Sequence, residues 1–422
     1  MLTRTGVAAV ATAVVATMGG ALPAPAAPTA GPPAAGQGKQ ATSYALEAFG
    51  YGSRVVGGSV PAGSDRSAFQ VIGCTNKAGI DKANAESDVD LGDGIALSGV
   101  KTRVWTSRHG GTVTSRARHH IAKVTVGDLP AASLVLRDVS STARVWHNAN
   151  GFHATTAARV AKIVLRPVGG TALVIPAPRR GESVRLPGIG RLTLGGGHEE
   201  VGRGYAIATG DALRLAIRPT RTKVFLAHSR ATIDAGVKQH LFGGSSFGTR
   251  LRGVEGALRS GETPFSVMPC EGTAGKPQTR SIARADLADT MSAAGLRTRQ
   301  RAVSRGDEAH AVERASVARV SLGGGLVVKG VTARAAVDRQ GADTSASARG
   351  TRVAAIRYQG ERLRLSPRGT LRIPGVAKLA TRVVQHHPGG IEVTALRVTL
   401  LDGSLATVDV GHAVARIRPS GL

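Results

Sequence analysis

The segment Gly244-Ser245-Ser246-Phe247-Gly248 has the G-x-S-x-G spacing of a nucleophilic serine held on a sharp strand-to-helix turn. Such a serine also needs a histidine as general base and an acid elsewhere in the fold. No helical pattern follows this segment, and glycines surround it. We therefore interpret Ser246 as a structural residue and nominate no catalytic residue.

Several histidines have spacings that would bring them near a metal ion. His198-Glu199-Glu200 begins like a zinc-binding H-E-x-x-H helix, but the second histidine would fall at Gly202. The pairs His119-His120 and His386-His387 lie in stretches that look like strands, where adjacent side chains point to opposite faces. We interpret these histidines as surface or core residues and expect no cofactor.

One acidic concentration interrupts an otherwise basic chain. Oxygen ligands grouped before Gly94 could hold calcium, although their spacing does not match an EF-hand loop. The alternative is a solvated strand at the edge of a sheet. The acidic residues are Asp81, Glu86, Asp88, Asp90 and Asp93.

The sequence contains a tandem duplication, which indicates how the structural elements that carry these residues are organised. Tyr51-Gly52-Ser53-Arg54-Val55 reappears as Phe247-Gly248-Thr249-Arg250-Leu251, and the segment Phe69–Cys74 reappears as Phe265–Cys270, in both cases 196 positions later (247 against 51). The later matches have smaller offsets, which shorter loops in the second copy would explain. The sequence therefore predicts two related units, at residues 44–238 and 241–418. The later matches are Leu186-Pro187-Gly188-Ile189 with Ile373-Pro374-Gly375-Val376, and His228 with His412, whose matching places suggest packing or hydrogen bonding.

The two cysteines, Cys74 and Cys270, occupy equivalent positions in the two units. In an exported protein a pair of cysteines suggests a disulfide. Equivalent positions can meet only across a pseudo-two-fold interface; otherwise each cysteine is a small buried residue of its own unit. Both possibilities remain open at the level of sequence.

The pattern of β-branched residues predicts an all-β fold. Runs at Thr112–Val126, Leu134–Trp146 and Phe152–Leu165 are separated by the turn signals Gly110-Gly111 and Asn150-Gly151. Only 3% of the residues are aromatic, so the core must be built from small side chains. We expect about ten long antiparallel strands per unit in a β-sandwich-like arrangement, with a β-solenoid as the alternative.

The N-terminus predicts export. A basic start at Arg4, an apolar stretch and the small residues Ala24-Pro25-Ala26 are typical of a signal peptide over residues 1–26. Residues 27–43, rich in Pro, Ala and Gly, predict a flexible leader. The apolar stretch is shorter than a membrane span, so we expect a secreted mature chain without a transmembrane segment.

Three segments of the first unit resemble the choice-of-anchor P family of secreted proteins from high-GC Gram-positive bacteria. These are Phe49-Gly50-Tyr51-Gly52-Ser53-Arg54, Val71-Ile72-Gly73-Cys74-Thr75 and Leu186-Pro187-Gly188-Ile189-Gly190. The second copy departs from the pattern at Pro269-Cys270-Glu271 and at Ala377. The resemblance implies a surface-directed domain that precedes varied anchoring signals, and it implies no catalytic or ligand-binding residues.

The charge suggests a partner. Lys and Arg number 55 against 28 Asp and Glu, a net charge of +27. Arginines at alternate strand positions would form a broad cationic surface suited to anionic wall polymers, while scarce aromatics argue against specific nucleic-acid binding. The alternative is a composition that merely keeps the surface soluble. The arginines are Arg103, Arg108, Arg116, Arg118, Arg144 and Arg159 in the first unit and Arg299, Arg301, Arg305, Arg314, Arg319 and Arg334 in the second.

These features together predict a non-catalytic secreted or cell-surface-associated protein that binds anionic wall polymers or another surface protein. The alternative function is an exported hydrolase acting on wall polysaccharide or ester, whose acids and histidines converge only in the folded chain.

Overall fold

The computed structural model describes most of the chain from residue 39 onward, as residues 39–57, 66–91, 94–127, 129, 131–219, 221–237, 239–253, 260–288, 291–364, 369–401 and 406–420. The predicted signal peptide, residues 1–26, and most of the predicted leader lie outside the described residues. Strand β1 begins at Gln40, so the last four residues assigned to the leader belong to the first sheet. None of the described segments forms a helix long and apolar enough to cross a membrane.

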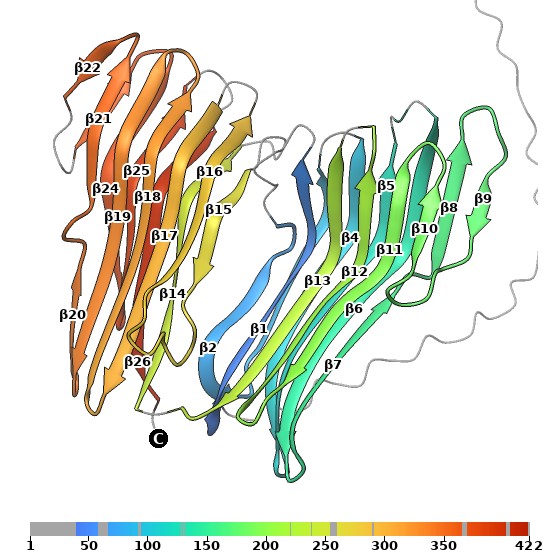
Figure 1. Ribbon diagram of the computed structural model, residues 1–422, viewed down its shortest axis with the longest axis horizontal. Coiled ribbons are helices and arrows are strands. Elements are labelled where there is room, and N and C mark those ends of the chain that lie inside the picture. The colour runs from blue at the N-terminus through green and yellow to red at the C-terminus, as the bar shows by residue number, and fades with distance from the viewer. Residues whose placement is uncertain are drawn as a thin grey trace, which may run out of the picture. The chain divides into compact units, whose positions relative to one another are not determined.

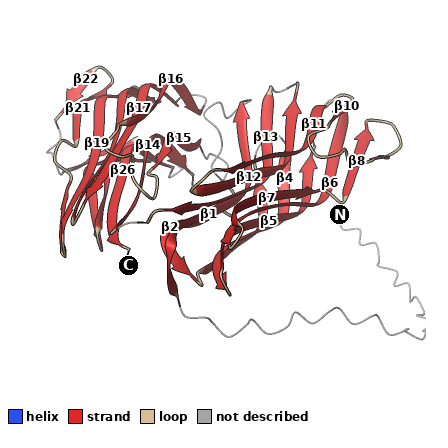
Figure 2. Cartoon of the chain, turned by 60° about the horizontal axis from the view of Figure 1, so that its bottom comes forward, coloured by secondary structure: helices blue, strands red, loops and turns tan. Residues whose placement is uncertain are grey.

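The described chain consists of strands and connecting loops, as Figure 2 shows. Within the described ranges each unit has thirteen strands, rather than about ten. Those of the first unit are β1 (Gln40–Gly57), β2 (Gln70–Ala78), β3 (Asp81–Asp90), β4 (Ile95–His109), β5 (Thr112–Val126), β6 (Ala132–Asn148), β7 (Gly151–Arg159), β8 (Lys162–Pro167), β9 (Leu173–Ile175), β10 (Ser183–Leu186), β11 (Gly190–Val201), β12 (Tyr205–Ile217) and β13 (Thr222–Ala235). Those of the second are β14 (His240–Arg252), β15 (Ser260–Val267), β16 (Gln278–Ala288), β17 (Met291–Arg305), β18 (Glu308–Leu322), β19 (Leu326–Gln340), β20 (Asp343–Ser347), β21 (Arg352–Tyr358), β22 (Glu361–Leu363), β23 (Thr370–Ile373), β24 (Ala377–His387), β25 (Gly390–Leu400) and β26 (Thr407–Pro419).

Each unit contains two antiparallel sheets with the same topology (Figure 1). In the first unit the strand orders are β10-β11-β12-β13-β1-β2 and β3-β4-β5-β6-β8-β9, with β7 also paired to β6. In the second unit they are β15-β14-β26-β25-β24-β23 and β16-β17-β18-β19-β21-β22, with β20 paired to β19. The first and last strands of each unit pair with each other, β1 with β13 and β14 with β26. The prediction of a duplicated antiparallel sandwich-like fold is confirmed, and the solenoid alternative is not the fold observed.

Two of the predicted turns are tight hairpins. Strands β4 and β5 turn at Gly110-Gly111, and β6 and β7 turn at Ala149-Asn150 just before Gly151. The run predicted as one strand over residues 152–165 instead forms β7 and β8, which pair with successive halves of β6. The break lies beside Asp138 of β6, whose backbone φ of 51° interrupts the regular ladder between the two halves.

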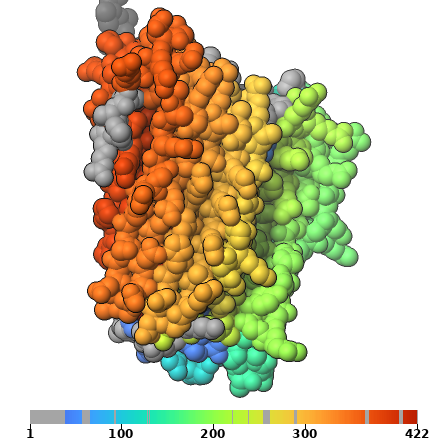
Figure 3. Space-filling view, turned by 60° about the vertical axis from the view of Figure 1, so that its left-hand side comes forward, coloured from blue at the N-terminus to red at the C-terminus, as the bar shows by residue number. Residues whose placement is uncertain are grey.

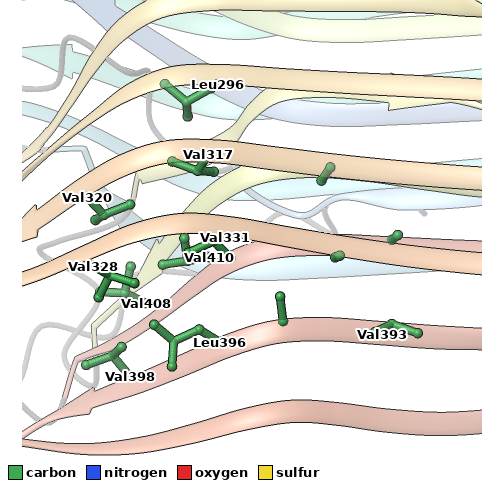
Figure 4. Packing of buried hydrophobic residues seen from close by; sticks show 14 of the residues in the cluster. Leu296, Val317, Val320, Val328, Val331, Val393, Leu396, Val398, Val408 and Val410 are labelled. Atoms are coloured by element: carbon green, nitrogen blue, oxygen red, sulfur yellow. The ribbon is translucent and has the colours of Figure 1, made fainter. Parts of the chain in front are cut away.

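The core lies between the two sheets of each unit and is built largely from Val, Leu, Ile and Ala. Figure 4 shows this packing in the second unit, where Leu296, Val317 and Val328 of one sheet face Leu396 and Val410 of the other. Because buried and exposed positions alternate along strands such as β18, small apolar residues fill most of the inward positions, while most charged residues stay in water. Each fully buried Val or Leu contributes about 1.5–3 kcal/mol, which offsets the scarcity of aromatic residues.

Candidate functional site

Ser246 does not lie on a nucleophile elbow. It is in the middle of strand β14, opposite Ala413 of β26 and Ser266 of β15, and its side chain is fully buried. Its hydroxyl donates a hydrogen bond of 2.7 Å to Oε2 of Glu313. A serine buried between two sheets cannot reach a substrate in solution, which agrees with our structural interpretation of the motif.

Glu313 itself is a residue that sequence reasoning missed. It lies on β18 at an inward position, between the buried Ala311 and Ala315, and its exposed fraction is 0%. Burial raises the pKa of its carboxyl well above the ordinary value, against a smaller opposing effect of the Ser246 hydroxyl. Its Oε1 atom has no hydrogen-bond partner within the described part of the chain. The available signal was its place in the period-two pattern of the strand, which assigns it to the core.

The adjacent histidines point to opposite sides of their strand, as predicted. His119 is fully buried in β5 and its Nδ1 lies 2.6 Å from the hydroxyl of Thr102, whereas His120 lies on the outer face, 3.4 Å from Asp138. Burial, followed by the charges of His120 and His228, lowers the pKa of His119 to about 3. His119 is therefore a neutral core residue.

The remaining histidine candidates also stay apart from any common metal position. His198 is exposed and lies 3.2 Å from Glu200, and His387 lies 3.2 Å from Glu392, while its neighbour His386 is exposed. Across the described ranges, no three His, Cys, Asp or Glu side chains come close enough together to hold a metal ion.

The equivalent histidines, His228 and His412, make the same contact in both units. His228 stacks on Tyr51 with ring centroids 4.5 Å apart, and His412 stacks on Phe247 at 4.4 Å. In each case the aromatic ring comes from the duplicated segment that starts the unit. This repetition agrees with the shared packing role that we expected.

Buried carboxylates neutralise some of the partly buried arginines. Asp409 is 2% exposed and accepts hydrogen bonds from Arg397 at 2.7 Å and from Arg250 at 3.1 Å. Burial alone would raise the pKa of Asp409, but the two guanidinium groups outweigh it and lower the pKa. In the first unit Asp211 is bound in a similar way by Arg214.

The described acidic residues of this segment, Asp81, Glu86, Asp88 and Asp90, form a solvated edge, as one of our two interpretations predicted. They belong to β3, which lies at the edge of its sheet and is exposed along nearly its whole length. Asp81 is bound by Arg103, and Glu86 accepts a hydrogen bond of 2.8 Å from the backbone of Ala68. Asp93 lies outside the described residues. Because two of the carboxylates already have partners, the strand gives the calcium interpretation no support.

Cys74 and Cys270 form a disulfide, with Cα atoms 5.1 Å apart. The bond lies in a small apolar cluster with Ala45 and Leu241. Close by, the side-chain amide of Asn76 donates to the backbone carbonyl of Ser420 at 2.6 Å. Of the two arrangements left open by the sequence, the structure contains the covalent link between the units.

The outer face of the β3–β9 sheet carries a cluster of arginines. Arg103 lies directly opposite Arg118 on the neighbouring strand, and Arg116 lies opposite Arg144. Like charges at facing positions of two strands destabilise the pairing. An anionic partner would relieve this repulsion.

The second unit has a corresponding basic face on its β16–β22 sheet. Arg299, Arg314 and Arg334 lie opposite one another on three adjacent strands, β17, β18 and β19. In the space-filling view of Figure 3, the yellow and orange residues of this part of the chain form a broad, continuous surface. Each unit thus places arginines together on the outer side of one sheet, at positions that alternate with the core.

Comparisons with known proteins identify no family for this chain. No family model matches it, and no curated protein matches it. Among solved structures, the β domain of the Bordetella autotransporter BrkA aligns over 90% of this chain and 100% of its own, at 11% sequence identity and a TM-score of 0.09. A TM-score this low carries no argument about fold or function.

Proposed function

We propose that this protein is a non-catalytic, secreted, surface-associated module that binds anionic polymers of the cell wall through the arginine faces of its two units. The observation that carries the proposal is the facing of like charges, with Arg299, Arg314 and Arg334 in one row of the second unit. A stable fold has no internal reason to place three cations directly opposite one another, whereas a polyanion gains from several at once.

The resemblance to the choice-of-anchor P family supports a surface location for this module and remains a prediction. The burial of Ser246 and His119 removes two groups that the alternative, an exported hydrolase, would have used. The net charge of +27 favours wall polyanions in general and does not select one polymer.

Co-sedimentation of residues 27–422 with purified Gram-positive cell walls, across a salt series, tests the proposal. We expect binding at low salt that weakens steeply as salt screens the charges, and that disappears when the anionic polymers are stripped from the wall. Absence of binding at low salt would refute the proposal.

A matched pair of variants separates the arginine face from net charge. Arg299→Gln with Arg314→Gln removes two charges from the face, while Arg203→Gln with Arg185→Gln removes two exposed charges elsewhere. We expect the first variant to bind walls about tenfold more weakly at low salt and the second to bind nearly as the wild type does. Equal losses in both variants would mean that composition, not the arrangement of the face, causes binding.

A further inference from the structure

Both tryptophans of the chain lie on the solvent side of one sheet. Trp105 is on β4 and Trp146 is on β6, at positions that alternate with buried neighbours such as Val104 and Val145. The chain has only 2 Trp in 422 residues and an aromatic content of 3%. Both rings are partly buried on the face opposite the core, so the core does not account for their place in the sequence.

The tryptophans are interleaved with cations. Arg103 and Arg116 lie over the ring of Trp105, 5.2 and 5.0 Å from its centroid, and Arg144 lies over the ring of Trp146 at 4.5 Å. The contacts restrict the orientation of each guanidinium group while leaving N–H groups at its edge free to donate. His153 stacks on Trp146 with centroids 4.9 Å apart and rings within 13° of parallel. We call Arg103, Trp105, Arg116, Arg144, Trp146 and His153 the Trp–Arg ladder.

The positive charge of the ladder is only partly neutralised within the described chain. Arg103 binds Asp81 at the sheet edge, but no carboxylate of the described residues pairs with Arg116 or Arg144. The Nε atom of Arg116 is buried and has no hydrogen-bond partner among those residues. Partial burial, followed by the charges of Arg144 and Arg118, lowers the pKa of Arg116. Arg116 and Arg144 therefore carry positive charge that has no carboxylate partner among the described residues, and an anion would supply the negative charge and the hydrogen-bond acceptors.

The second unit lacks this arrangement, although its strands pair in the same register. Arg116 opposite Arg144 becomes Val312 opposite Ala336, so neither arginine is kept. At the place of Trp146 stands Asp338, which is bound by His310 and so brings a carboxylate to the face. The ladder is therefore specific to the first unit and is not required by the duplicated fold.

We propose that the Trp–Arg ladder is a preorganised binding site for a phosphodiester polymer of the polyol-phosphate type. The inference rests on the proposed function and specifies the site and the chemistry of its ligand. A guanidinium group can bind two phosphate oxygens with parallel hydrogen bonds, and the indole rings hold the groups in position before the ligand arrives. Facing positions lie about 5 Å apart across the strands and alternate positions about 7 Å apart along them, so successive phosphates of one chain can engage successive arginines.

The tryptophans provide a direct test, because all of the indole fluorescence of the chain comes from the ladder. Residues 27–422 are titrated with soluble poly(glycerol phosphate), and with uncharged dextran as the control polymer. We expect a saturable change in tryptophan emission with the anionic polymer and none with dextran. Trp105→Leu keeps every charge and leaves Trp146 as the reporter, and we expect about three- to fivefold weaker binding.

Further variants distinguish positioning from simple attraction. Trp105→Phe retains an aromatic ring under Arg103 and Arg116 and is expected to recover most of the affinity, which a folding defect in Trp105→Leu would not predict. Arg185→Gln, at an exposed position on β10 in the other sheet of the first unit, is the control for charge and should leave the emission response unchanged. Wild-type affinity of Trp105→Leu for poly(glycerol phosphate) would overturn the ladder as a site.

The outcomes also separate this inference from the proposed function. Binding to cell walls without any change in emission on adding poly(glycerol phosphate) would overturn the ladder and leave the wall-binding function intact. A saturable emission change without wall binding would keep the ladder and overturn the function. Equal affinity for single-stranded DNA of the same charge would overturn the assignment to polyol phosphate, because the site would then bind any phosphate polymer.

Discussion

Replacing Glu313 by glutamine is expected to remove the contribution that this carboxyl makes to the pH dependence of the second unit's stability between pH 5 and 7. Glu313 lies fully buried between two sheets, where Ser246 donates to Oε2 and no described group donates to Oε1. This environment raises the pKa of the carboxyl well above its ordinary value of 4.5, chiefly because burial disfavours the charged form. The folded chain therefore holds a proton that the unfolded chain has already released.

The sign of the effect follows from this difference in proton binding. An acid whose pKa is raised by folding contributes stability that is fully present below the unfolded pKa and is lost as the pH rises toward the folded pKa. While only the unfolded carboxyl is ionised, the loss is about 1.4 kcal/mol per pH unit, or roughly 2.7 kcal/mol over two units. A glutamine at this position carries no charge in either state, so this contribution disappears in the variant.

Urea unfolding at a series of pH values, for the wild type and for Glu313→Gln, measures the effect directly. Other titrating groups cancel in the difference between the two proteins. Glu308→Gln, an exposed position at the start of the same strand, is the matched control and should follow the wild type. The same pH slope in the wild type and in Glu313→Gln would show that Glu313 ionises in the folded state, which would refute the burial argument.

Two further predictions concern the covalent link and one close backbone contact. Cys74→Ser with Cys270→Ser is expected to lower the free energy of unfolding by about 2–4 kcal/mol, and reductant should lower the melting temperature of the wild type but not of the variant. Gly190→Ala should destabilise the first unit by more than about 2 kcal/mol, because a Cβ atom would lie 1.9 Å from the carbonyl oxygen of Ala216. Gly73→Ala, where a Cβ meets nothing within 4 Å, should change the midpoint of urea unfolding little; equal effects at the two glycines would contradict the contact argument.

The all-β fold and its two units could be predicted from the sequence, because turn residues, alternating β-branched residues and the duplication all indicate them. The strand predicted at Thr112–Val126 has the bounds of β5, because a Gly-Gly turn precedes it and its β-branched residues alternate with polar ones. The break between β7 and β8 was not predictable, because the kink that separates them lies in the partner strand, at Asp138. When a strand ends because of a kink in the neighbouring strand, the residues of the strand itself carry no signal for that boundary.

For the surface site, the sequence predicted the kind of side chain, arginine on one face of a sheet, but not which residues lie next to one another. Alternation showed that arginines such as Arg116 and Arg118 could share a face, but not which residues of other strands would face them. The pairing of Arg116 with Trp105 and Arg144 depends on the register of two hairpins, which a one-residue shift would change completely. The burial of Glu313 was likewise missed: its inward place in the period-two pattern was visible, but an acidic side chain is normally expected in solvent.

The duplication separates residues that the fold requires from residues that are free to serve a partner. Gly99 and Gly295 have the same φ of 62°, and a Cβ on either would lie within 3 Å of the facing alanine, so the backbone explains why both copies keep glycine. The Leu-Pro-Gly-Ile segment at 186–189 forms a β-turn closed by a 3.1 Å hydrogen bond from Ile189 to Leu186, with φ of 72° at its glycine, and the equivalent turn recurs at 373–376.

Of the three segments behind the family resemblance, one is this turn and the other two lie within strands β1 and β2, so they carry information about the fold and none about the ligand. The Trp–Arg ladder has the opposite distribution, since it occurs in one copy and no turn or core contact requires it. Residues that differ between two copies of one fold are not required by the fold, so they can change to bind a partner without a loss of stability. Under the proposed function, the ladder would give the first unit the specificity for the polymer, while the second unit adds charge and is joined to the first through the Cys74–Cys270 disulfide.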